Sequence, residues 1–280
     1  MDRERFADKL AAAVARNDSL VCVGLDPDPR QMPDALRERP DALAYFAAGI
    51  VEATADLVCA YKPNLAFYEA LGEAGMAGLR ATLRAMPPDV PVLLDAKRGD
   101  IGVSARGYAA AIFDDLGADA ITVSPYLGFD TVEPFLAYAD RGVFVLCKTS
   151  NPGSAEFQDQ LVAVDGQFRP LYEQVARAAV RTNARGNVGL VVGATHPETF
   201  RTVRAVAPDL PFLVPGIGAQ GGDLAMAVGE GQDRHGAGLL IASSRAIIYA
   251  SRGADWQAAA RGAAGELRGA INALRRRGVG

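Results

Sequence analysis

Eight short apolar runs, rich in Val, Leu and Ile, recur along the chain at an average spacing of about 31 residues, the length of a strand, a loop and a crossover helix. Each run is continuous rather than alternating, as in parallel strands that are buried on both faces. The predicted strands cover residues 20–26, 57–64, 90–97, 120–126, 143–150, 189–195, 212–217 and 238–244.

Ala-rich segments with helical periodicity separate these runs; Leu79, Leu83 and Met86, for example, fall on one helical face. Strands that alternate with amphipathic helices predict a parallel sheet covered by helices. Eight such units favour a closed (β/α)8 TIM barrel of the α/β class over a doubly wound open sheet, which periodicity alone does not exclude. No repeat, linker or low-complexity segment divides the chain, so we expect residues 1–280 to form a single barrel domain.

The two ends and two loops add detail to this barrel. Phe6, Leu10 and Val14 share one helical face and predict an extra N-terminal helix that covers the bottom of the barrel. Two connections exceed the usual 2 to 6 residues, namely residues 27–41 after the first strand and residues 151–168 after the fifth. Both are candidate rim loops or lids.

Composition narrows the function classes. Half of the residues are hydrophobic, and the formal net charge of -4 provides no basic field for nucleic acid or an anionic membrane. No apolar stretch reaches the roughly 18 residues of a membrane span, so we expect a cytoplasmic protein. Cys22, Cys59 and Cys147 lie inside apolar runs and are expected to be buried free thiols. With two histidines and no paired ligand motif, no dedicated metal site is expected.

Polar residues close every predicted strand at its C-terminal end. In a barrel these ends gather at one mouth, where enzymes of this architecture keep their active sites. The chain has four lysines and 25 arginines, and three of the four lysines lie at the ends of predicted strands. Lysine can give up its proton whereas arginine keeps it, so this placement suggests a task that requires proton transfer. The polar strand ends are Asp26, Lys62, Asp95, Lys97, Ser124, Lys148, Ser150, Thr195, Ser243 and Ser244.

The third strand ends in DAKRGD, residues 95–100, which places four charges in six positions. Alternation puts Asp95 and Lys97 on the same face, pointing into the mouth, and turns Arg98 away. Asp100 begins the turn into the next helix. A purely structural interpretation would make Asp95 and Lys97 an internal salt bridge and Asp100 a helix cap. The polar residues at the other strand ends favour a functional site over this interpretation.

A glycine-rich stretch, LVPGIGAQGGD at residues 213–223, follows the seventh strand. Gly216, Gly218 and Gly221 formally match GxGxxG, but no acidic residue closes the following strand, which argues against dinucleotide binding. Backbone N–H groups of such a turn can hold one phosphate, and the loops after strands seven and eight form the usual phosphate cup of these barrels. Gln220 and Arg245 therefore favour a phosphomonoester site over a plain tight turn.

Several of these motifs together resemble the orotidine 5'-monophosphate decarboxylase family over essentially the whole chain. The motifs are DAKRGDI, VPGIGAQGGD followed by SSR, LDP at 25–27, YKPN at 61–64 and KTSNPG at 148–153. The KPN motif, the long first loop, Arg98 and Gly99 resemble the bacterial type 2 subgroup. The resemblance implies conversion of orotidine 5'-monophosphate to UMP and CO2 in de novo pyrimidine biosynthesis. It also implies that no metal or cofactor is used, and that the enzyme is a homodimer with shared active sites.

The resemblance also implies residue roles. Lys97 would donate the proton to C6 of the pyrimidine, in an array with Asp95 and Asp100, and Asp100 would reach into the partner's site. Ser104 would also serve the partner's site, at a position where the family usually has Thr. The implied substrate-binding residues are Asp26 and Lys62 at the ribose, Ser150 at the pyrimidine edge, and Gly218, Gln220, Gly221 and Arg245 at the phosphate.

The chemistry is consistent with a lysine. A fixed ammonium at C6 stabilises the carbanion left by CO2 and then protonates it, and arginine does not readily perform the second step. Three alternatives stay open. They are a metal-assisted sugar-phosphate decarboxylase or aldolase of the same superfamily, a Schiff-base aldolase that uses Lys97 or Lys148, and a non-catalytic nucleotide-binding barrel.

Overall fold

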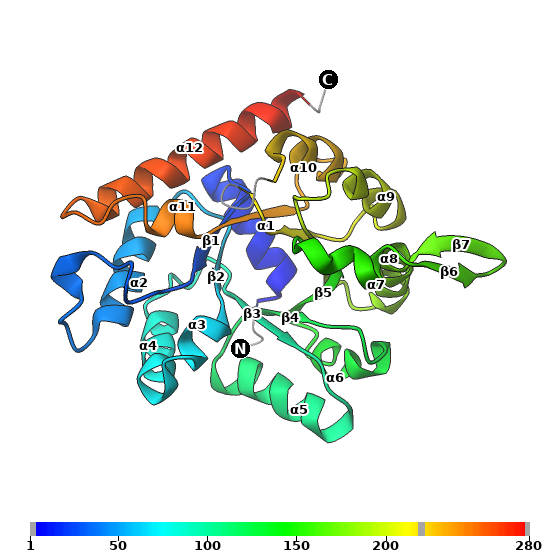
Figure 1. Cartoon of the computed structure of the whole chain (residues 1–280), viewed down its shortest axis with the longest axis horizontal. Helices are drawn as coiled ribbons and strands as arrows, with labels where there is room; N and C mark the ends of the chain where they lie inside the picture. The colour runs from blue at the N-terminus through cyan, green and yellow to red at the C-terminus, as the bar shows by residue number, and fades with distance from the viewer. Residues whose placement is uncertain (1–3, 218–221, 278–280) are drawn as a thin grey trace.

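The computed structural model describes residues 4–217 and 222–277, with side chains as far as residue 275. Eight parallel strands form a barrel with helices around it, which confirms the predicted (β/α)8 fold (Figure 1). Each strand falls on one of the eight predicted apolar runs. The strands are β1 (Val21–Leu25), β2 (Ala60–Pro63), β3 (Leu93–Arg98), β4 (Ala120–Val123), β5 (Gly142–Lys148), β8 (Val188–Val192), β9 (Phe212–Val214) and β10 (Leu239–Ser243).

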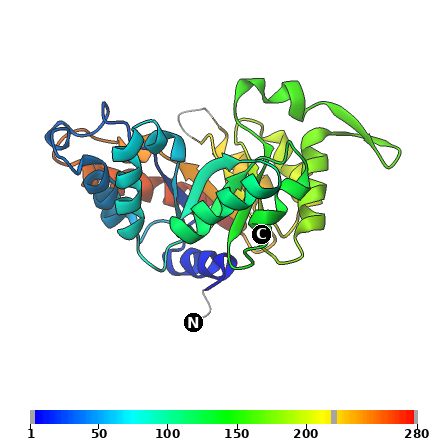
Figure 2. The same ribbon diagram turned by 90° about the horizontal axis from the view of Figure 1, so that it is seen from below.

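The helices cover the outside of the barrel, apart from α1, which lies across one end (Figures 1 and 2). Within the described residues, no helix is both long enough and apolar enough to cross a membrane. The α-helices are α1 (Phe6–Asn17), α2 (Ala42–Thr54), α3 (Leu65–Glu69), α4 (Gly72–Arg84), α5 (Gly102–Ala110), α6 (Glu133–Leu136), α7 (Ala155–Gln158), α8 (Leu171–Thr182), α9 (Glu198–Val206), α10 (Leu224–Gly231), α11 (Arg245–Ile248) and α12 (Trp256–Arg277).

The strands are hydrogen-bonded in the order β2-β1-β10-β9-β8-β5-β4-β3. Closure between β2 and β3 rests on two isolated bridges, which pair Tyr61 with Val92 and Asn64 with Asp95. The barrel is therefore nearly closed, with a seam between these two strands where isolated bridges take the place of a continuous ladder.

Helix α1 closes the bottom of the barrel, as its apolar face predicted. Phe6 meets Phe144 of β5 edge to face, with ring centroids 5.7 Å apart. Gly142 makes room for this contact, since a Cβ there would lie 2.5 Å from the Phe6 ring. Phe6 and Phe144 belong to a small core inside the barrel, together with Cys22, Cys59, Ala60, Leu93, Ala120, Val191, Leu213, Leu240 and Ala242.

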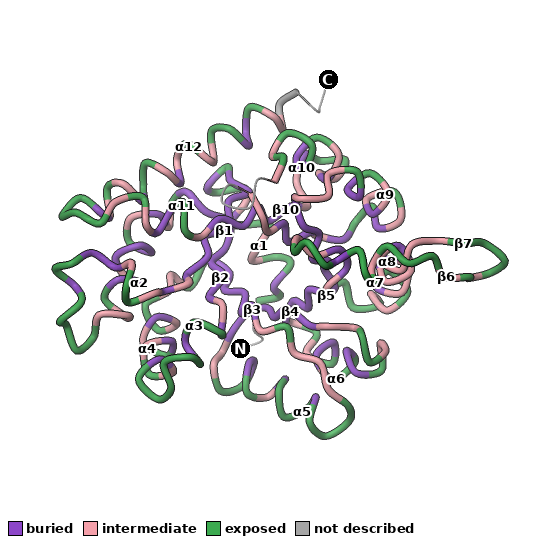
Figure 3. Tube along the Cα trace, in the orientation of Figure 1, coloured by how far each residue is buried: buried purple, intermediate pink, exposed green. Residues whose placement is uncertain are grey.

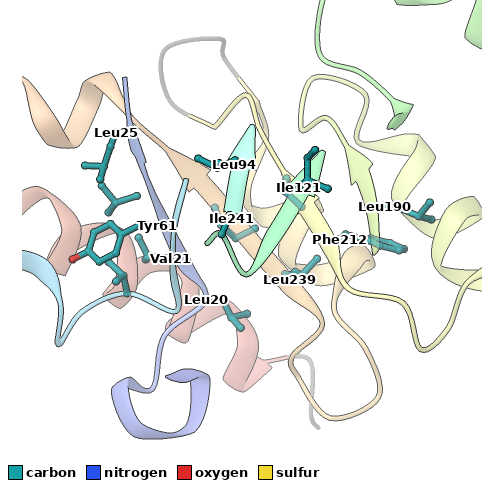
Figure 4. Close-up of a cluster of buried hydrophobic side chains, with 14 of the residues drawn as sticks. Leu20, Val21, Leu25, Tyr61, Leu94, Ile121, Leu190, Phe212, Leu239 and Ile241 are labelled. Carbon is teal, nitrogen blue, oxygen red and sulfur yellow. The ribbon is translucent and has the colours of Figure 1, made fainter. Parts of the chain in front are cut away.

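A second and larger core lies between the barrel and its helices. Figure 3 shows buried strands at the centre and exposed outer surfaces on the helices. Both strand faces are buried, which explains why the apolar runs are continuous rather than alternating. Side chains of this outer core shown in Figure 4 include Leu20, Val21, Leu25, Tyr61, Leu94, Ile121, Leu190, Phe212, Leu239 and Ile241.

The long loop after β5 contains α7 and a hairpin that the sequence did not predict. Strands β6 (Leu161–Val164) and β7 (Gln167–Pro170) pair in antiparallel fashion and extend away from the barrel (Figure 2). Their turn residues, Asp165 and Gly166, have φ angles of 51° and 73°. Two successive positive φ angles are the geometry of a type I′ turn, for which Asp-Gly is a preferred pair.

Candidate active site

The C-terminal ends of the strands form the mouth of the barrel opposite α1. A cavity of about 140 Å³ opens there, lined by three of the predicted site residues, Asp26, Lys62 and Arg245. These residues lie at the ends of β1, β2 and β10, which are consecutive in the barrel. Residues far apart in the sequence are thus brought into one pocket by the order of the strands.

Lys62, Asp95 and Lys97 form a continuous charge array beside this cavity. Nζ of Lys62 lies 3.0 Å from Oδ2 of Asp95, and Nζ of Lys97 lies 2.5 Å from Oδ1. Burial alone would raise the pKa of Asp95, but the two ammonium groups hold it well below its usual range. Burial alone would likewise lower the pKa of Lys62, but Asp95 and Asp26 raise it above its usual value. The carboxylate and its lysines therefore stabilise one another in the charged form.

Lys97 reaches Asp95 from an irregular strand. Its φ angle is 46°, in the left-handed region that side chains other than glycine and asparagine rarely adopt. The pairing of β3 with β4 shifts register between Leu94 and Arg98. The two side chains meet as alternation predicted, but through a bulge rather than a regular pleat. Arg98 turns away and pairs with Glu69 of α3.

Thr122 of β4 is a site neighbour that the sequence reasoning missed. Its hydroxyl lies 3.0 Å from Oδ1 of Asp95, and also accepts hydrogen bonds from the backbone N–H groups of Ala96 and Lys97. The residue occupies the middle of an apolar run, AITV, and therefore looked like an ordinary strand position. Its polarity in that run was the only available signal.

Asp26 and Ser244 face each other across Gly24 with unused polar atoms. Oδ1 of Asp26 and Oγ of Ser244 are buried and accept or donate no hydrogen bond within the described residues. A Cβ on Gly24 of β1 would lie 2.7 Å from Cβ of Ser244, which follows β10. Glycine is therefore needed for β1 and the end of β10 to approach this closely. Buried polar atoms without partners are costly, and a bound molecule with hydroxyl groups would satisfy them.

Arg245, the first residue of α11, is exposed at the edge of the cavity. No acidic side chain of the described residues forms an ion pair with it, so its guanidinium is available to an anion. Gly218, Gln220 and Gly221, the other predicted phosphate contacts, lie outside the described residues.

Ser150 follows β5 and is held against the end of β8. Its carbonyl oxygen accepts a hydrogen bond from Oγ1 of Thr195 at 3.0 Å, and a Cβ on Gly193 would lie 2.7 Å from its backbone nitrogen. Lys148, two residues earlier, is buried and pairs with Asp159, with 2.6 Å between Nζ and Oδ1. This ion pair joins the end of β5 to the segment that leads into the β6–β7 hairpin.

Asp100 and Ser104 do not join the charge array of their own chain. Oδ1 of Asp100 accepts a hydrogen bond from the N–H of Ile101 at 2.7 Å, and Ser104 is exposed on α5. Within the described residues, Asp100 forms no ion pair with Lys97. Of the predicted catalytic residues, the structure thus brings Asp95 and Lys97 together and leaves Asp100, which is half-buried, outside the array.

Known proteins share this sequence and architecture. A family model described as Orotidine 5'-phosphate decarboxylase / HUMPS family matches residues 19–261. The chain belongs to this family. Orotidine 5'-phosphate decarboxylase from Roseiflexus castenholzii is 53% identical over 272 residues, which cover 97% of this chain and 98% of that protein. The same enzyme from Thermomicrobium roseum is 51% identical over 276 residues, with 98% of both chains covered.

Solved structures of the decarboxylase family agree. Leishmania donovani OMP decarboxylase superimposes with a TM-score of 0.83 at 45% identity and covers 97% of this chain and 99% of its own. Leishmania donovani UMP synthase gives a TM-score of 0.85 at 47% identity, where this chain spans 57% of the longer protein. The activity is therefore the decarboxylation of orotidine 5'-monophosphate to UMP, a carboxy-lyase reaction of pyrimidine biosynthesis.

Proposed function

We propose that Lys97 is the proton donor of this decarboxylation. The bond between C6 and the carboxylate breaks, CO2 leaves, and the electron pair stays on C6 as a carbanion. The ammonium of Lys97 stabilises this charge and transfers one proton to C6, which gives UMP and a neutral lysine that recovers its proton from solvent. The observation that carries the proposal is the 2.5 Å contact between Lys97 and Asp95 at the mouth of the barrel.

Asp95 keeps the donor charged and oriented until the carbanion forms. Lys62 on the other side of Asp95 helps to hold the pKa of this carboxylate below its usual range, so Asp95 remains ionised at neutral pH. Lys97 is the member of the array with the most exposed side chain, at 49%, whereas Asp95 is 10% exposed. The geometry supports a fixed carboxylate that presents a movable ammonium to the substrate.

The remaining groups bind the nucleotide. The unpartnered oxygen of Asp26, together with Lys62, contacts the ribose hydroxyls, and Ser150 contacts the pyrimidine edge. Arg245 binds the phosphate at the opposite end of the cavity, assisted by Gly218, Gln220 and Gly221. Binding energy from the phosphate, far from C6, then contributes to lowering the barrier at the reacting carbon.

A second copy of the chain completes the site. Ile101 and Val103, which follow β3, are 62% and 75% exposed, and Tyr126 and Leu127, which follow β4, are exposed as well. The loops that carry them touch at Gly99, where a Cβ would lie 3.0 Å from the carbonyl oxygen of Ser124. These four exposed apolar side chains, called the apolar patch below, are the proposed dimer face, because large apolar side chains are often covered by a partner. Asp100 and Ser104 border it and reach the partner's site.

An assay of orotidine 5'-monophosphate turnover in the presence of EDTA tests the proposed function. We expect full activity with the chelator, loss of turnover in Lys97→Met with UMP binding preserved, and normal turnover in the control Lys9→Met. Lys9 pairs with Asp119 and carries none of the proposed roles. Appreciable turnover by Lys97→Met would remove Lys97 from the donor role, and a borohydride-trapped adduct would favour a Schiff-base enzyme instead.

We also propose the cytoplasm as the location of the enzyme. Cys22, Cys59 and Cys147 are free and buried, as is usual for thiols in a reducing compartment.

A further inference from the structure

The hydroxyl of Thr122 is the centre of a small hydrogen-bond network under the charge array. The side chain lies on β4 and is 1% exposed. Its Oγ1 is 3.0 Å from each of three atoms, namely Oδ1 of Asp95, N of Ala96 and N of Lys97. A hydroxyl has one proton and two lone pairs, so it donates to the carboxylate and accepts from both amides. No hydrogen-bonding capacity is left unused.

This network lies where β3 departs from regular geometry. The ladder between β3 and β4 runs from the pair Leu94–Ile121 to the pair Arg98–Val123. Residues 95–97 therefore face a single residue of β4, Thr122. The N–H groups of residues 96 and 97 take the Thr122 side chain as their acceptor in place of a backbone carbonyl. A partly buried bulge of this kind is stabilised by such an acceptor, because unpaired amides are costly.

The bulge determines where the proposed donor points. Lys97 holds a left-handed backbone with φ of 46°, a conformation that is strained for a residue with a Cβ. The surroundings must over-determine such a conformation for it to persist. Oγ1 of Thr122 accepts a hydrogen bond from the backbone N–H of Lys97 and donates one to the carboxylate of Asp95. One atom therefore restrains both members of the Asp95–Lys97 pair.

We propose that Thr122 is a positioning residue for the decarboxylation. It acts through Asp95 and Lys97 and does not itself touch the substrate. Its hydroxyl sets the bulge and the carboxylate so that the Lys97 ammonium is directed to the reacting carbon. This inference rests on the proposed donor role of Lys97.

An isosteric substitution separates this role from simple packing. Thr122→Val keeps the shape and removes the hydroxyl, whereas Thr122→Ser keeps the hydroxyl and removes a methyl group. If Thr122 only filled space, Ser would be the more harmful change; if it positions the pair, Val would be. We expect Thr122→Val to lower kcat by about 10- to 100-fold with KM nearly unchanged, as for outer hydrogen-bond partners of a site. Thr122→Ser should retain most of the activity.

A matched control measures the general cost of losing a buried threonine hydroxyl. Thr54 of α2 is fully buried, and its Oγ1 donates to the carbonyl of Ile50 at 2.7 Å and lies 2.9 Å from the Tyr61 hydroxyl. Thr54→Val should lower thermal stability and leave kcat unchanged. Crystal structures of the two valine variants should show the Lys97–Asp95 contact longer than 2.5 Å only in Thr122→Val.

Three results would overturn the proposal: a wild-type kcat in Thr122→Val, an equal loss in Thr122→Ser, or an equal loss in Thr54→Val. Should Thr122→Val fail to fold, Thr122→Ala carries the same expectation for kcat. Binding of UMP to the folded variants is measured in parallel and should match the wild-type protein. If Lys97 is not the proton donor, Lys97→Met will still turn over the substrate. The threonine variants do not test that point, so failure of the proposed function and failure of this inference can be told apart.

Discussion

Lys62 donates a hydrogen bond to Asp95 across the junction of β2 and β3, with Nζ 3.0 Å from Oδ2. This junction is the seam of the barrel, where the backbone contributes only isolated bridges in the described part of the chain. An ion pair of the active site therefore also joins the first and last strands of the hydrogen-bonded order. The proposed chemistry at the mouth and the closure of the barrel thus involve the same two side chains.

The pair should give the enzyme a defined pH range of stability. Asp95 has a lowered pKa, so its contribution is present above the unfolded value of about 4 and is lost as the pH falls further. Lys62 has a raised pKa, so its contribution is present below about 10.4 and is lost as the pH rises further.

Urea unfolding of the wild-type protein and of the double variant Lys62→Met/Asp95→Asn checks this prediction. The difference in unfolding free energy should be constant between about pH 5 and about pH 9 and should decrease outside that range. A difference that changes steadily within the range would show that other groups determine the pH dependence.

Arg245→Ala should weaken substrate capture by removing a charge-assisted contact with the phosphate. Such contacts contribute about 1.5–3 kcal/mol, which corresponds to a loss of about 10- to 150-fold in kcat/KM. Orotidine, which lacks the phosphate, should be turned over equally slowly by the wild-type protein and the variant. The control is Arg201→Ala, which removes an arginine that pairs with Glu230 on the outer surface. A similar loss with both substrates would assign Arg245 to another part of the nucleotide.

Mixed subunits test the shared site. Inactive Asp100→Ala and inactive Lys97→Ala chains, mixed and allowed to exchange, should regain part of the activity because one site per dimer then has both groups. Val103→Glu should separate the dimer in sedimentation experiments, since it places a charge in the apolar patch. Val180→Glu, at an exposed position of α8, serves as the control. Exchange without any recovery of activity would contradict the cross-subunit role of Asp100.

The buried pair of Lys148 and Asp159 should respond unequally to loss of its two partners. The Lys148 side chain is 1% exposed, whereas that of Asp159 is 44% exposed. Asp159→Asn leaves a buried ammonium without a counter-charge and should destabilise the protein by about 3–5 kcal/mol. Lys148→Met leaves a carboxylate that water can reach, so its cost should be clearly smaller.

Denaturant unfolding measures both changes, with Asp115→Asn as a control in the exposed pair with Arg80, where little change in stability is expected. Equal costs for Asp159→Asn and Lys148→Met would mean that the ammonium is better solvated than its burial indicates.

The fold could be predicted because its signal is local and repeated. Each barrel strand is buried on both faces, so the apolar runs mark all eight strands without reference to the rest of the chain. The β6–β7 hairpin was missed although Asp165 and Gly166 are a preferred turn pair, because the flanking residues were interpreted as a loop. The Asp-Gly pair is the one local signal in this segment that predicts a hairpin.

The charge array was only partly predictable. Alternation correctly associates Asp95 with Lys97, but Lys97 has a left-handed backbone whose N–H donates to Thr122, a residue of the neighbouring strand. No local pattern encodes such a contact. Asp100 and Ser104 could be assigned only through the family resemblance, because nothing in a single chain places them beside the lysine.

The conformation of Lys97 has a consequence for protein engineering. Glycine adopts its φ angle of 46° without strain, so a search guided by stability alone would favour glycine over lysine at this position. The chain instead has lysine at this position, the residue that we propose as the proton donor, although the backbone conformation disfavours it. Programmes that aim to make this catalyst more heat-resistant should therefore leave position 97 unchanged and look for gains in the distant helices.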